Sequence, residues 1–294
     1  MRHITFHRPR RALRASVLAV LLATSCGTDA SGPDSTDETT ITQAAAVSEP
    51  QLSMTLPGTL AAGFQELQAG LKGRFGMAVM PVGGDRPAMF GNWTTGPAWS
   101  TMKVPLTIAA IRADSSYGGY AASAAITESD NTAAEVLWEA LGSPQSAAAS
   151  VEEILREAGD EETTVPAARA RPDHSAFGQA EWSLAEQVRF ASRLPCLPQS
   201  QKVVDLMEQI VPAHRWGLGA FTGAEFKGGW GPDAAGKYLV RQFGLIVTPS
   251  GRIAVAFAAQ PDSGAFADGM KALDRMASLV SDHLDELSAG TCAR

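Results

Sequence analysis

The chain has 294 residues, of which 45% are hydrophobic and 19% charged, a composition typical of a globular protein with one large domain and attachments. Its net charge of −7 argues against nucleic acid as a partner and against charge-driven binding to an anionic membrane surface. Residues 1–25 carry five arginines and no acidic residue, so the remainder carries −12. The positive charge is therefore concentrated in one short segment.

That segment, residues 1–25, has the organisation of a bacterial export signal. A basic start with Arg8, Arg10, Arg11 and Arg14 precedes an apolar stretch at 15–23, which is too short to span a bilayer but suits a signal sequence. The stretch ends in ATSC at 23–26, which resembles the lipobox of bacterial lipoproteins. We therefore predict a lipoprotein signal peptide at 1–25 and a lipid on Cys26 that anchors the protein at the extracytoplasmic face of the cell membrane. The alternative is ordinary cleavage, with Cys26 incidental.

Residues 26–57 are predicted to form a disordered tether. From Gly27 to Pro57 the chain is rich in Ser, Thr, Asp, Ala and Pro and holds no aromatic and no basic residue. Such a composition cannot bury enough apolar surface to order itself. The folded domain is therefore expected at 58–294.

The elements of that domain are predicted in the order helix, strands, helices, strands, helix. Apolar residues at helical spacing indicate a helix over 60–71, followed by a strand over 75–82 and a hairpin partner over 86–93. A long helical region runs over 100–194. Strands return at 225–229, 238–247 and 252–259, and an amphipathic helix closes the chain at 266–287. This order predicts an α+β fold, in which terminal helices flank a mixed antiparallel sheet built from both ends of the chain and the middle forms an all-helical lobe.

Two cysteines remain beside Cys26, namely Cys196 and Cys292. In an oxidising compartment such a pair often forms a disulfide, which would tie the end of the chain to the middle of the domain. Two free thiols are the open alternative, because spacing alone does not show whether their Cα atoms lie close enough.

The first motif with chemical meaning is Ser100-Thr-Met-Lys103. Side chains at i and i+3 of a helix lie on one face, so the Ser100 hydroxyl and the Lys103 amine are expected to be neighbours. A serine becomes a nucleophile when a base takes its proton, and a lysine with a lowered pKa is such a base. Alone, the pattern fits equally a serine that caps a helix beside a solvated lysine.

Two further motifs follow in order. Ser129-Asp130-Asn131 stands on a predicted loop before a helix, and Lys227-Gly228-Gly229 lies on a predicted strand. Together the three motifs resemble the SxxK, SDN and KTG set of the class A β-lactamase and penicillin-binding protein family of serine hydrolases. The resemblance covers 58–294. The high alanine content and the anchored tether fit a lipoprotein member of actinobacterial type.

The resemblance implies a role for each matched residue. Ser100 is the nucleophile, Lys103 helps to remove its proton, and Ser129 passes a proton to the leaving nitrogen. Asn131 positions Lys103 and the substrate amide, and Lys227 supplies positive charge. The backbone N–H groups of Ser100 and Trp230 would form the oxyanion hole.

Two residues are assigned to substrate binding. Gly229 belongs to the strand motif, and Arg241 matches a family arginine that holds the substrate carboxylate, a task suited to a guanidinium fork. The alternative for Arg241 is an ordinary strand residue at the surface. Gly228 departs from the family pattern because it lacks the hydroxyl that contacts the same carboxylate, which weakens the expected carboxylate recognition.

The loop over 165–178 departs further, because it lacks the glutamate that activates the deacylating water in class A β-lactamases. Asp173 and His174 are its only candidates for a general base, and each is more often a plain polar loop residue. We therefore expect a serine acyl-transfer hydrolase that acts on β-lactams or peptidoglycan-like amides through an acyl-enzyme and deacylates slowly.

The alternative function is a catalytically inactive lipoprotein of the same fold that serves as a binding or scaffold module of the cell envelope. The histidines are far apart in sequence and no nucleotide-binding fingerprint occurs, so no metal and no other cofactor is expected. We expect a monomer whose partners are a small-molecule substrate and, through the lipid, the membrane.

Overall fold

The computed structural model describes residues 58–292. The predicted signal peptide at 1–25, with Cys26 and the tether at 26–57, lies outside the described residues. Within 58–292, no helix combines the length and the apolar composition needed to cross a membrane.

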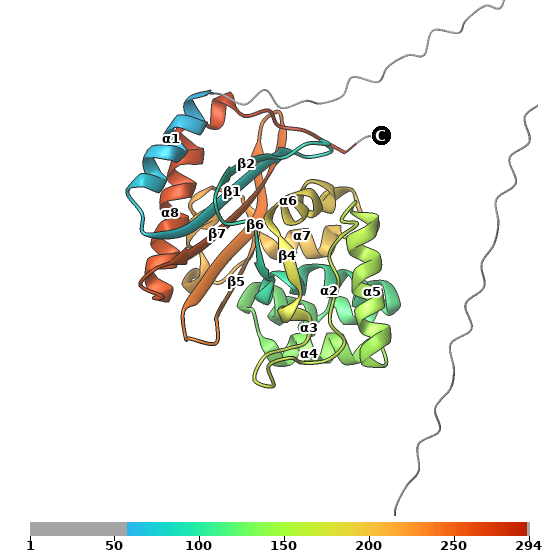
Figure 1. The fold of residues 1–294 in the computed structure, drawn as a ribbon. Helices are drawn as coiled ribbons and strands as arrows, with labels where there is room; N and C mark the ends of the chain where they lie inside the picture. Colours follow the sequence, from blue (N-terminus) through green and yellow to red (C-terminus); the bar gives the residue numbers. More distant parts are fainter. Residues whose placement is uncertain (1–57, 293–294) are drawn as a thin grey trace, which may run out of the picture. The chain divides into compact units, whose positions relative to one another are not determined.

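A five-stranded sheet joins the two ends of the domain in the order β2-β1-β7-β6-β5, and every pairing in it is antiparallel (Figure 1). Both of its faces are covered by helices, which explains why β6 and β7 read as almost unbroken apolar runs. The predicted α+β fold class is confirmed. The strands are β1 (Gly73–Pro81), β2 (Ala88–Gly91), β5 (Glu225–Pro232), β6 (Tyr238–Thr248) and β7 (Gly251–Pro261).

The first and last helices, α1 (Gly58–Ala69) and α8 (Phe266–Asp282), pack against each other on one face of the sheet (Figure 1). Helix α1 buries Leu60, Phe64 and Leu67, whose spacing of four and three residues places them on one stripe. The other face contacts α6 and the helical lobe. The remaining helices are α2 (Lys103–Ala113), α3 (Tyr120–Ser123), α4 (Asn131–Ala140), α5 (Pro144–Glu157), α6 (Leu184–Arg193) and α7 (Gln201–Met207).

A small second sheet pairs β3 (Thr95–Pro97) with β4 (Glu181–Ser183). This sheet could not be predicted from the sequence, because three-residue strands are too short to show an alternating pattern. The sheet leads the chain into the turn that carries Ser100.

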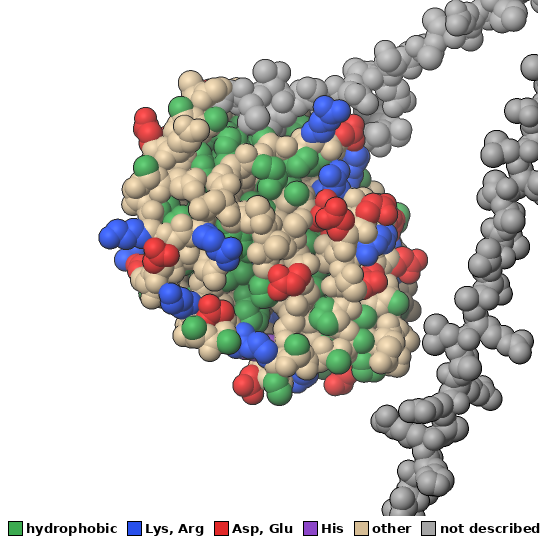
Figure 2. Space-filling view, in the orientation of Figure 1, with side chains coloured by type: hydrophobic (Ala, Val, Ile, Leu, Met, Phe, Trp, Pro, Cys, Tyr) green, Lys and Arg blue, Asp and Glu red, His purple; other side chains and the backbone are tan. Residues whose placement is uncertain are grey.

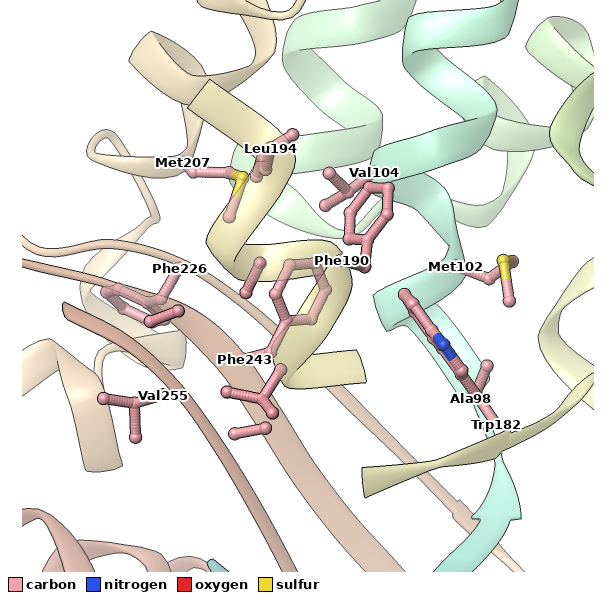
Figure 3. Close-up of a cluster of buried hydrophobic side chains, with 14 of the residues drawn as sticks. Ala98, Met102, Val104, Trp182, Phe190, Leu194, Met207, Phe226, Phe243 and Val255 are labelled. Atoms are coloured by element: carbon pink, nitrogen blue, oxygen red, sulfur yellow. The ribbon is translucent and has the colours of Figure 1, made fainter. Parts of the chain in front are cut away.

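The core between the main sheet and the helical lobe is aromatic. Trp182, Phe190 and Phe243 meet edge to face, with ring centroids 5.5–5.7 Å apart (Figure 3). Ala98 and Met102, which flank the Ser100 turn, are fully buried in the same cluster. The turn is therefore fixed from behind by close packing.

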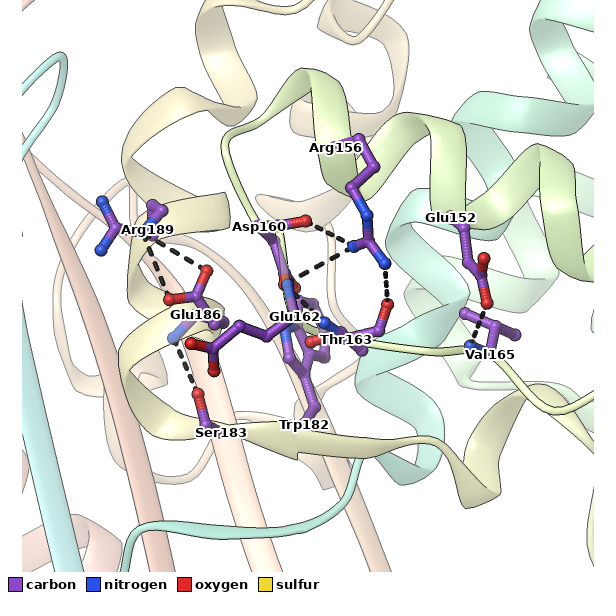
Figure 4. Close-up of polar contacts among 10 residues, drawn as sticks. All are labelled: Glu152, Arg156, Asp160, Glu162, Thr163, Val165, Trp182, Ser183, Glu186 and Arg189. Carbon is purple, nitrogen blue, oxygen red and sulfur yellow. Dashed lines mark hydrogen bonds and ion pairs between the residues drawn. The ribbon is translucent and has the colours of Figure 1, made fainter. Parts of the chain in front are cut away.

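A buried carboxylate anchors the start of the loop over 165–178. Asp160 is fully buried and accepts hydrogen bonds from the indole of Trp182 and from the backbone N–H groups of Glu162 and Thr163 (Figure 4). Arg156 donates to the carbonyl oxygens of Asp160 and Thr163. Because these groups satisfy one another's hydrogen-bonding capacity, the segment from which the loop begins is held rigidly.

Cys196 and Cys292 form a disulfide with their Cα atoms 5.4 Å apart, so the pairing that the sequence left open is present. The final segment also pairs with the sheet, through a bridge between Gly290 and Arg252. Figure 2 shows acidic and basic side chains interspersed over one face of the domain.

Candidate active site

Ser100 lies on a strained turn between β3 and α2. Residues Trp99–Met102 form a 3-10 turn that continues into α2, and Trp99 has a positive φ of 50°. A bulky residue adopts this conformation only where its surroundings hold it. The hydroxyl of Thr101 provides such a hold, because it donates to the carbonyl of Ala98 and accepts from Gln187.

Lys103 lies one turn further, on the first residue of α2, and is almost completely buried. Its Nζ donates to the carbonyl oxygen of Ser129 at 2.5 Å and to Oδ1 of Asn131 at 2.7 Å, and lies 3.4 Å from Oγ of Ser129. A neutral amine has two N–H groups and one lone pair. If the two short bonds use both N–H groups, the lone pair is available to accept a proton.

The SDN segment is presented by unusual backbone geometry. Residues Ala124–Glu128 form a π-helical turn, and Ser129 then adopts a left-handed conformation with φ 60°. Asp130 caps α4 by accepting from the backbone N–H of Ala133, so that Asn131 opens the helix. The strained serine is thereby turned toward both lysines.

Lys227 reaches the same hydroxyl from the sheet. It lies on β5, is 2% exposed, and its Nζ donates to Oγ of Ser129 and to the carbonyl of Gly228, each at 2.9 Å. The Ser129 hydroxyl therefore stands between two buried amines, one from α2 and one from β5. Four of the predicted residues, Lys103, Ser129, Asn131 and Lys227, form one hydrogen-bonded group.

The two amines are shifted toward their neutral forms. Burial lowers the pKa of Lys103 from 10.5 to about 7, although the charges of Asp130 and Glu135 act in the opposite direction. Burial also lowers the pKa of Lys227 well below its ordinary value, and the nearby Lys103 adds to the effect. A lysine whose pKa lies near 7 can act as the base that removes the proton of a serine hydroxyl.

This shift predicts a pH dependence for acylation of Ser100. Below pH 7 Lys103 is mostly charged and has no lone pair, so the acylation rate should fall about tenfold for each further pH unit. The rate should be measured between pH 5 and 9 in the parent and in H174Q and H214Q, because both histidines lie near the site. The fall in acylation rate at acidic pH should persist in both variants. A rate that does not change with pH, or loss of the fall in either variant, would contradict the assignment to Lys103.

Gly229 lies where β5 closely approaches the backbone of the Ser100 turn. A Cβ atom there would lie 2.9–3.0 Å from the carbonyl of Ala98 and the backbone nitrogens of Ser100 and Thr101. Only glycine fits this spacing, and the next residue, Trp230, lines the same cavity as Ser100. The oxyanion hole formed by the N–H groups of Ser100 and Trp230 remains a prediction that this geometry suits.

The substitution Gly229→Ala should therefore lower acylation of Ser100 about 10²-fold, because a Cβ atom would force β5 away from the nucleophile's backbone N–H. Gly118→Ala is the matched control, since a Cβ there meets only side-chain atoms of Ile111 at 3.8 Å. Thermal unfolding of both variants separates loss of fold from loss of rate. Equal acylation rates in the two variants would refute the role given to Gly229.

Gly228 faces an aromatic wall. A Cβ atom there would meet the ring of Trp216 at 3.0 Å and 3.2 Å, and Trp216 packs edge to face against Trp230. His214 packs at a tilt against the same Trp230, with ring centroids 5.0 Å apart. A residue with a hydroxyl at 228 would therefore have to displace the ring of Trp216 by a few tenths of an ångström, which agrees with the glycine that stands in place of the KTG threonine.

The prediction that Arg241 holds a substrate carboxylate is wrong. Arg241 is fully buried, and its terminal nitrogens donate to the carbonyls of Gly96, Pro97 and Trp182 and to Oε1 of Gln187. Its guanidinium also lies 5.0 Å from the ring centroid of Trp93. These contacts use both ends of its fork to join β6 to the β3–β4 sheet, so Arg241 is a structural residue.

A cavity of about 240 Å³, here called the Ser100 cleft, opens at Ser100. Among the hydrogen bonds of residues 58–292, none is made by the Ser100 hydroxyl, which is thus available to a ligand. A larger cavity of about 390 Å³ lies at the end of α1, away from these groups. The Ser100 cleft is lined by Trp99, Ser100, Asn131, Glu135, Arg169, Asp173, His174, Ser175 and Trp230.

Several lining residues were missed by the sequence analysis. Glu135 stands four residues after Asn131 on α4, a spacing that shares one helix face and could have revealed it. Arg169 forms an ion pair with Glu135 at 3.1 Å. His214 and Trp216 lie outside this lining and pack against Trp230, and no motif links them to the matched residues. Within 58–292, no cluster of His, Cys, Asp or Glu is arranged to hold a metal ion.

Solved structures of class A β-lactamases match the described domain. The enzyme from Mycobacterium abscessus gives a TM-score of 0.62 at 16% identity, covering 77% of this chain and 99% of its own. A β-lactamase from Chitinophaga pinensis gives 0.63 at 15%, covering 76% and 99%. The chain has the fold of the class A β-lactamases. A mutant of the class A enzyme of the last common ancestor of Gram-negative bacteria gives 0.60 at 22%, covering 77% and 99%.

The likeness is one of fold. No family model matches the sequence, and no curated protein does so either. Within this fold, the chain's own geometry brings Lys103, Ser129, Asn131 and Lys227 together.

Proposed function

We propose that this protein is a serine acyl-transfer hydrolase that acts on β-lactams or related amide bonds through an acyl-enzyme on Ser100. The observation that carries the proposal is the Ser129 hydroxyl held between the buried amines of Lys103 and Lys227, beside a cleft into which Ser100 opens. A cluster of buried lysines costs folding energy, because each charge must be desolvated or the amine neutralised. Perturbed groups of this kind in a cleft are typical of catalytic sites.

The reaction follows from the contacts. Lys103 takes the proton of Ser100 as the oxygen attacks the carbonyl carbon, and backbone N–H groups stabilise the oxyanion. The C–N bond then breaks, and the Ser129 hydroxyl gives its proton to the leaving nitrogen while Lys103 passes to Ser129 the proton that it took from Ser100. Asn131 keeps the Lys103 amine in place through the 2.7 Å bond.

Deacylation is proposed to be slow. The loop over 165–178 offers Asp173 and His174 to the cleft and no glutamate. His174 lies with its ring edge-on to Trp99, 5.0 Å between centroids, and burial lowers its pKa further below its usual range. An acyl-enzyme that forms readily and hydrolyses slowly would behave more like a penicillin-binding protein than like an efficient β-lactamase.

The proposal is tested with a fluorescent penicillin. The purified protein is expected to acquire a covalent label that survives denaturation, and prior incubation with unlabelled benzylpenicillin should prevent it. Protein denatured before the incubation is the control for non-specific labelling. Absence of label at every concentration, or label that the competitor does not prevent, would contradict the proposal.

A second candidate function is a catalytically inactive binding or scaffold module of the cell envelope. It is favoured by the loss of both expected carboxylate contacts, since Gly228 lacks a hydroxyl and Arg241 is buried in structural bonds. It predicts that the fluorescent penicillin leaves no covalent label while the ligand still protects the protein from thermal unfolding.

We also propose that the protein is held at the extracytoplasmic face of the cell membrane by a lipid on Cys26. The disulfide between Cys196 and Cys292 supports an oxidising compartment. The variant Cys26→Ala should move the protein from the membrane fraction to the soluble fraction of cells that produce it. Retention in the membrane fraction would contradict the anchor.

A further inference from the structure

The Ser100 cleft contains a carboxylate that no step of the acylation uses. Glu135 lies on α4, one helical turn after Asn131, and lines the cleft together with Ser100. Its side chain is 26% exposed, so it faces the cleft and water reaches it. A carboxylate in this position can accept a proton from a water molecule bound at the acylated serine.

The electrostatics of the site place Glu135 close to the reacting groups. Its negative charge raises the pKa of Lys103 against the effect of burial, and only a nearby charge does so. The other acidic residue of the cleft, Asp173, lies on the exposed loop and acts on His174. Glu135 is therefore the carboxylate of the cleft that is both on a rigid helix and coupled to the Ser100–Lys103 pair.

We propose that Glu135 is the general base of deacylation, an inference that rests on the proposed acyl-enzyme function. Glu135 takes one proton from a water molecule as the water oxygen bonds to the acyl carbon. The oxyanion then collapses, the bond from carbon to Oγ of Ser100 breaks, and a proton returns to Oγ. The product is a carboxylic acid, and Ser100, Lys103 and Glu135 regain their starting states.

Arg169 holds this carboxylate in place. Its Nη2 lies 3.1 Å from Oε2 of Glu135, and the arginine comes from the loop over 165–178. The ion pair thereby orients the Glu135 carboxylate within the cleft.

The test measures the lifetime of the acyl-enzyme by intact mass spectrometry after a pulse of benzylpenicillin. In E135Q the amide cannot accept a proton, so the lifetime should lengthen about 10²-fold or more, with the rate of acylation changed only a few-fold. E139Q is the matched control, because Glu139 lies one turn further on the same helix and is exposed; its lifetime should equal that of the parent. E135D should recover part of the lost deacylation.

A purely structural role of the ion pair gives a different result. If Glu135 only anchored the loop through Arg169, R169Q would trap the acyl-enzyme as strongly as E135Q does. If Glu135 is the base, R169Q keeps deacylation at close to the parent rate, because the carboxylate remains on α4 at the cleft. Trapping by R169Q, or by D173N or H174Q in place of E135Q, would overturn the assignment.

Failure of this inference is distinguishable from failure of the proposed function. An acyl-enzyme that forms in E135Q and decays as fast as in the parent would overturn the role of Glu135 and leave the Ser100 acyl-enzyme intact. If the parent forms no adduct with benzylpenicillin, the proposed function fails and the role of Glu135 fails with it.

Discussion

Replacing Ser100 by alanine should abolish covalent labelling by a fluorescent penicillin. The expectation follows from the position of Ser100, which opens into the cleft while the other site hydroxyl, Ser129, is held between two lysines. A hydroxyl that already accepts from Lys227 at 2.9 Å is placed to pass protons and is poorly placed to attack a carbonyl. Without Ser100 the site retains its binding groups and loses the oxygen that forms the ester.

The matched control is Ser115→Ala, because Ser115 is exposed on a turn after α2 and should label as the parent does. The fold of S100A should be unchanged, since the removed hydroxyl makes no hydrogen bond among the described residues. Thermal unfolding of both variants checks this. Label in S100A at the parent rate would place the nucleophile elsewhere.

Replacing Lys103 by methionine should lower the second-order rate constant for acylation by about 10²–10⁴-fold. Methionine has nearly the length of lysine and suits a buried position, so the change removes the base and keeps most of the packing. The loss exceeds what removal of a surface charge produces, because the amine with a pKa of about 7 is the group that takes the Ser100 proton.

The stability of K103M is expected to change in two opposing ways. The carbonyl of Ser129 and Oδ1 of Asn131 lose a donor, and because both contacts are only partly buried, each loss costs at most about 1–3 kcal/mol. Removal of a desolvated amine offsets part of this cost. Lys202→Met, at an exposed position on α7, is the control, and an acylation rate in K103M within threefold of that in K202M would contradict the assignment.

The residues predictable from the sequence are those whose role is set by local spacing. Ser100 and Lys103 are one helical turn apart, and Asp130 caps the helix that Asn131 opens, so short motifs were sufficient to find them. The long strands β6 and β7 were predictable because each is an almost unbroken apolar run, which is visible in the sequence itself.

The predictions that failed concern side chains whose direction depends on contacts with distant segments of the chain. Arg241 lies on the strand predicted for it, yet its guanidinium donates to carbonyl groups of the β3–β4 sheet. Those carbonyls belong to strands of three residues, which no pattern reveals. The fit of Trp216 against Gly228 and the pairing of Arg169 with Glu135 likewise join distant segments, so they needed the fold before they could be found.

The most direct test of the account is to locate the adduct. The protein is incubated with benzylpenicillin, digested, and its peptides are mapped by mass spectrometry. We predict a single modified peptide whose added mass equals that of the intact penicillin and whose modified residue is Ser100. An adduct on any other residue, or an unmodified Ser100 peptide under saturating penicillin, would contradict the claim that this hydroxyl and its two lysines form one acyl-transfer site.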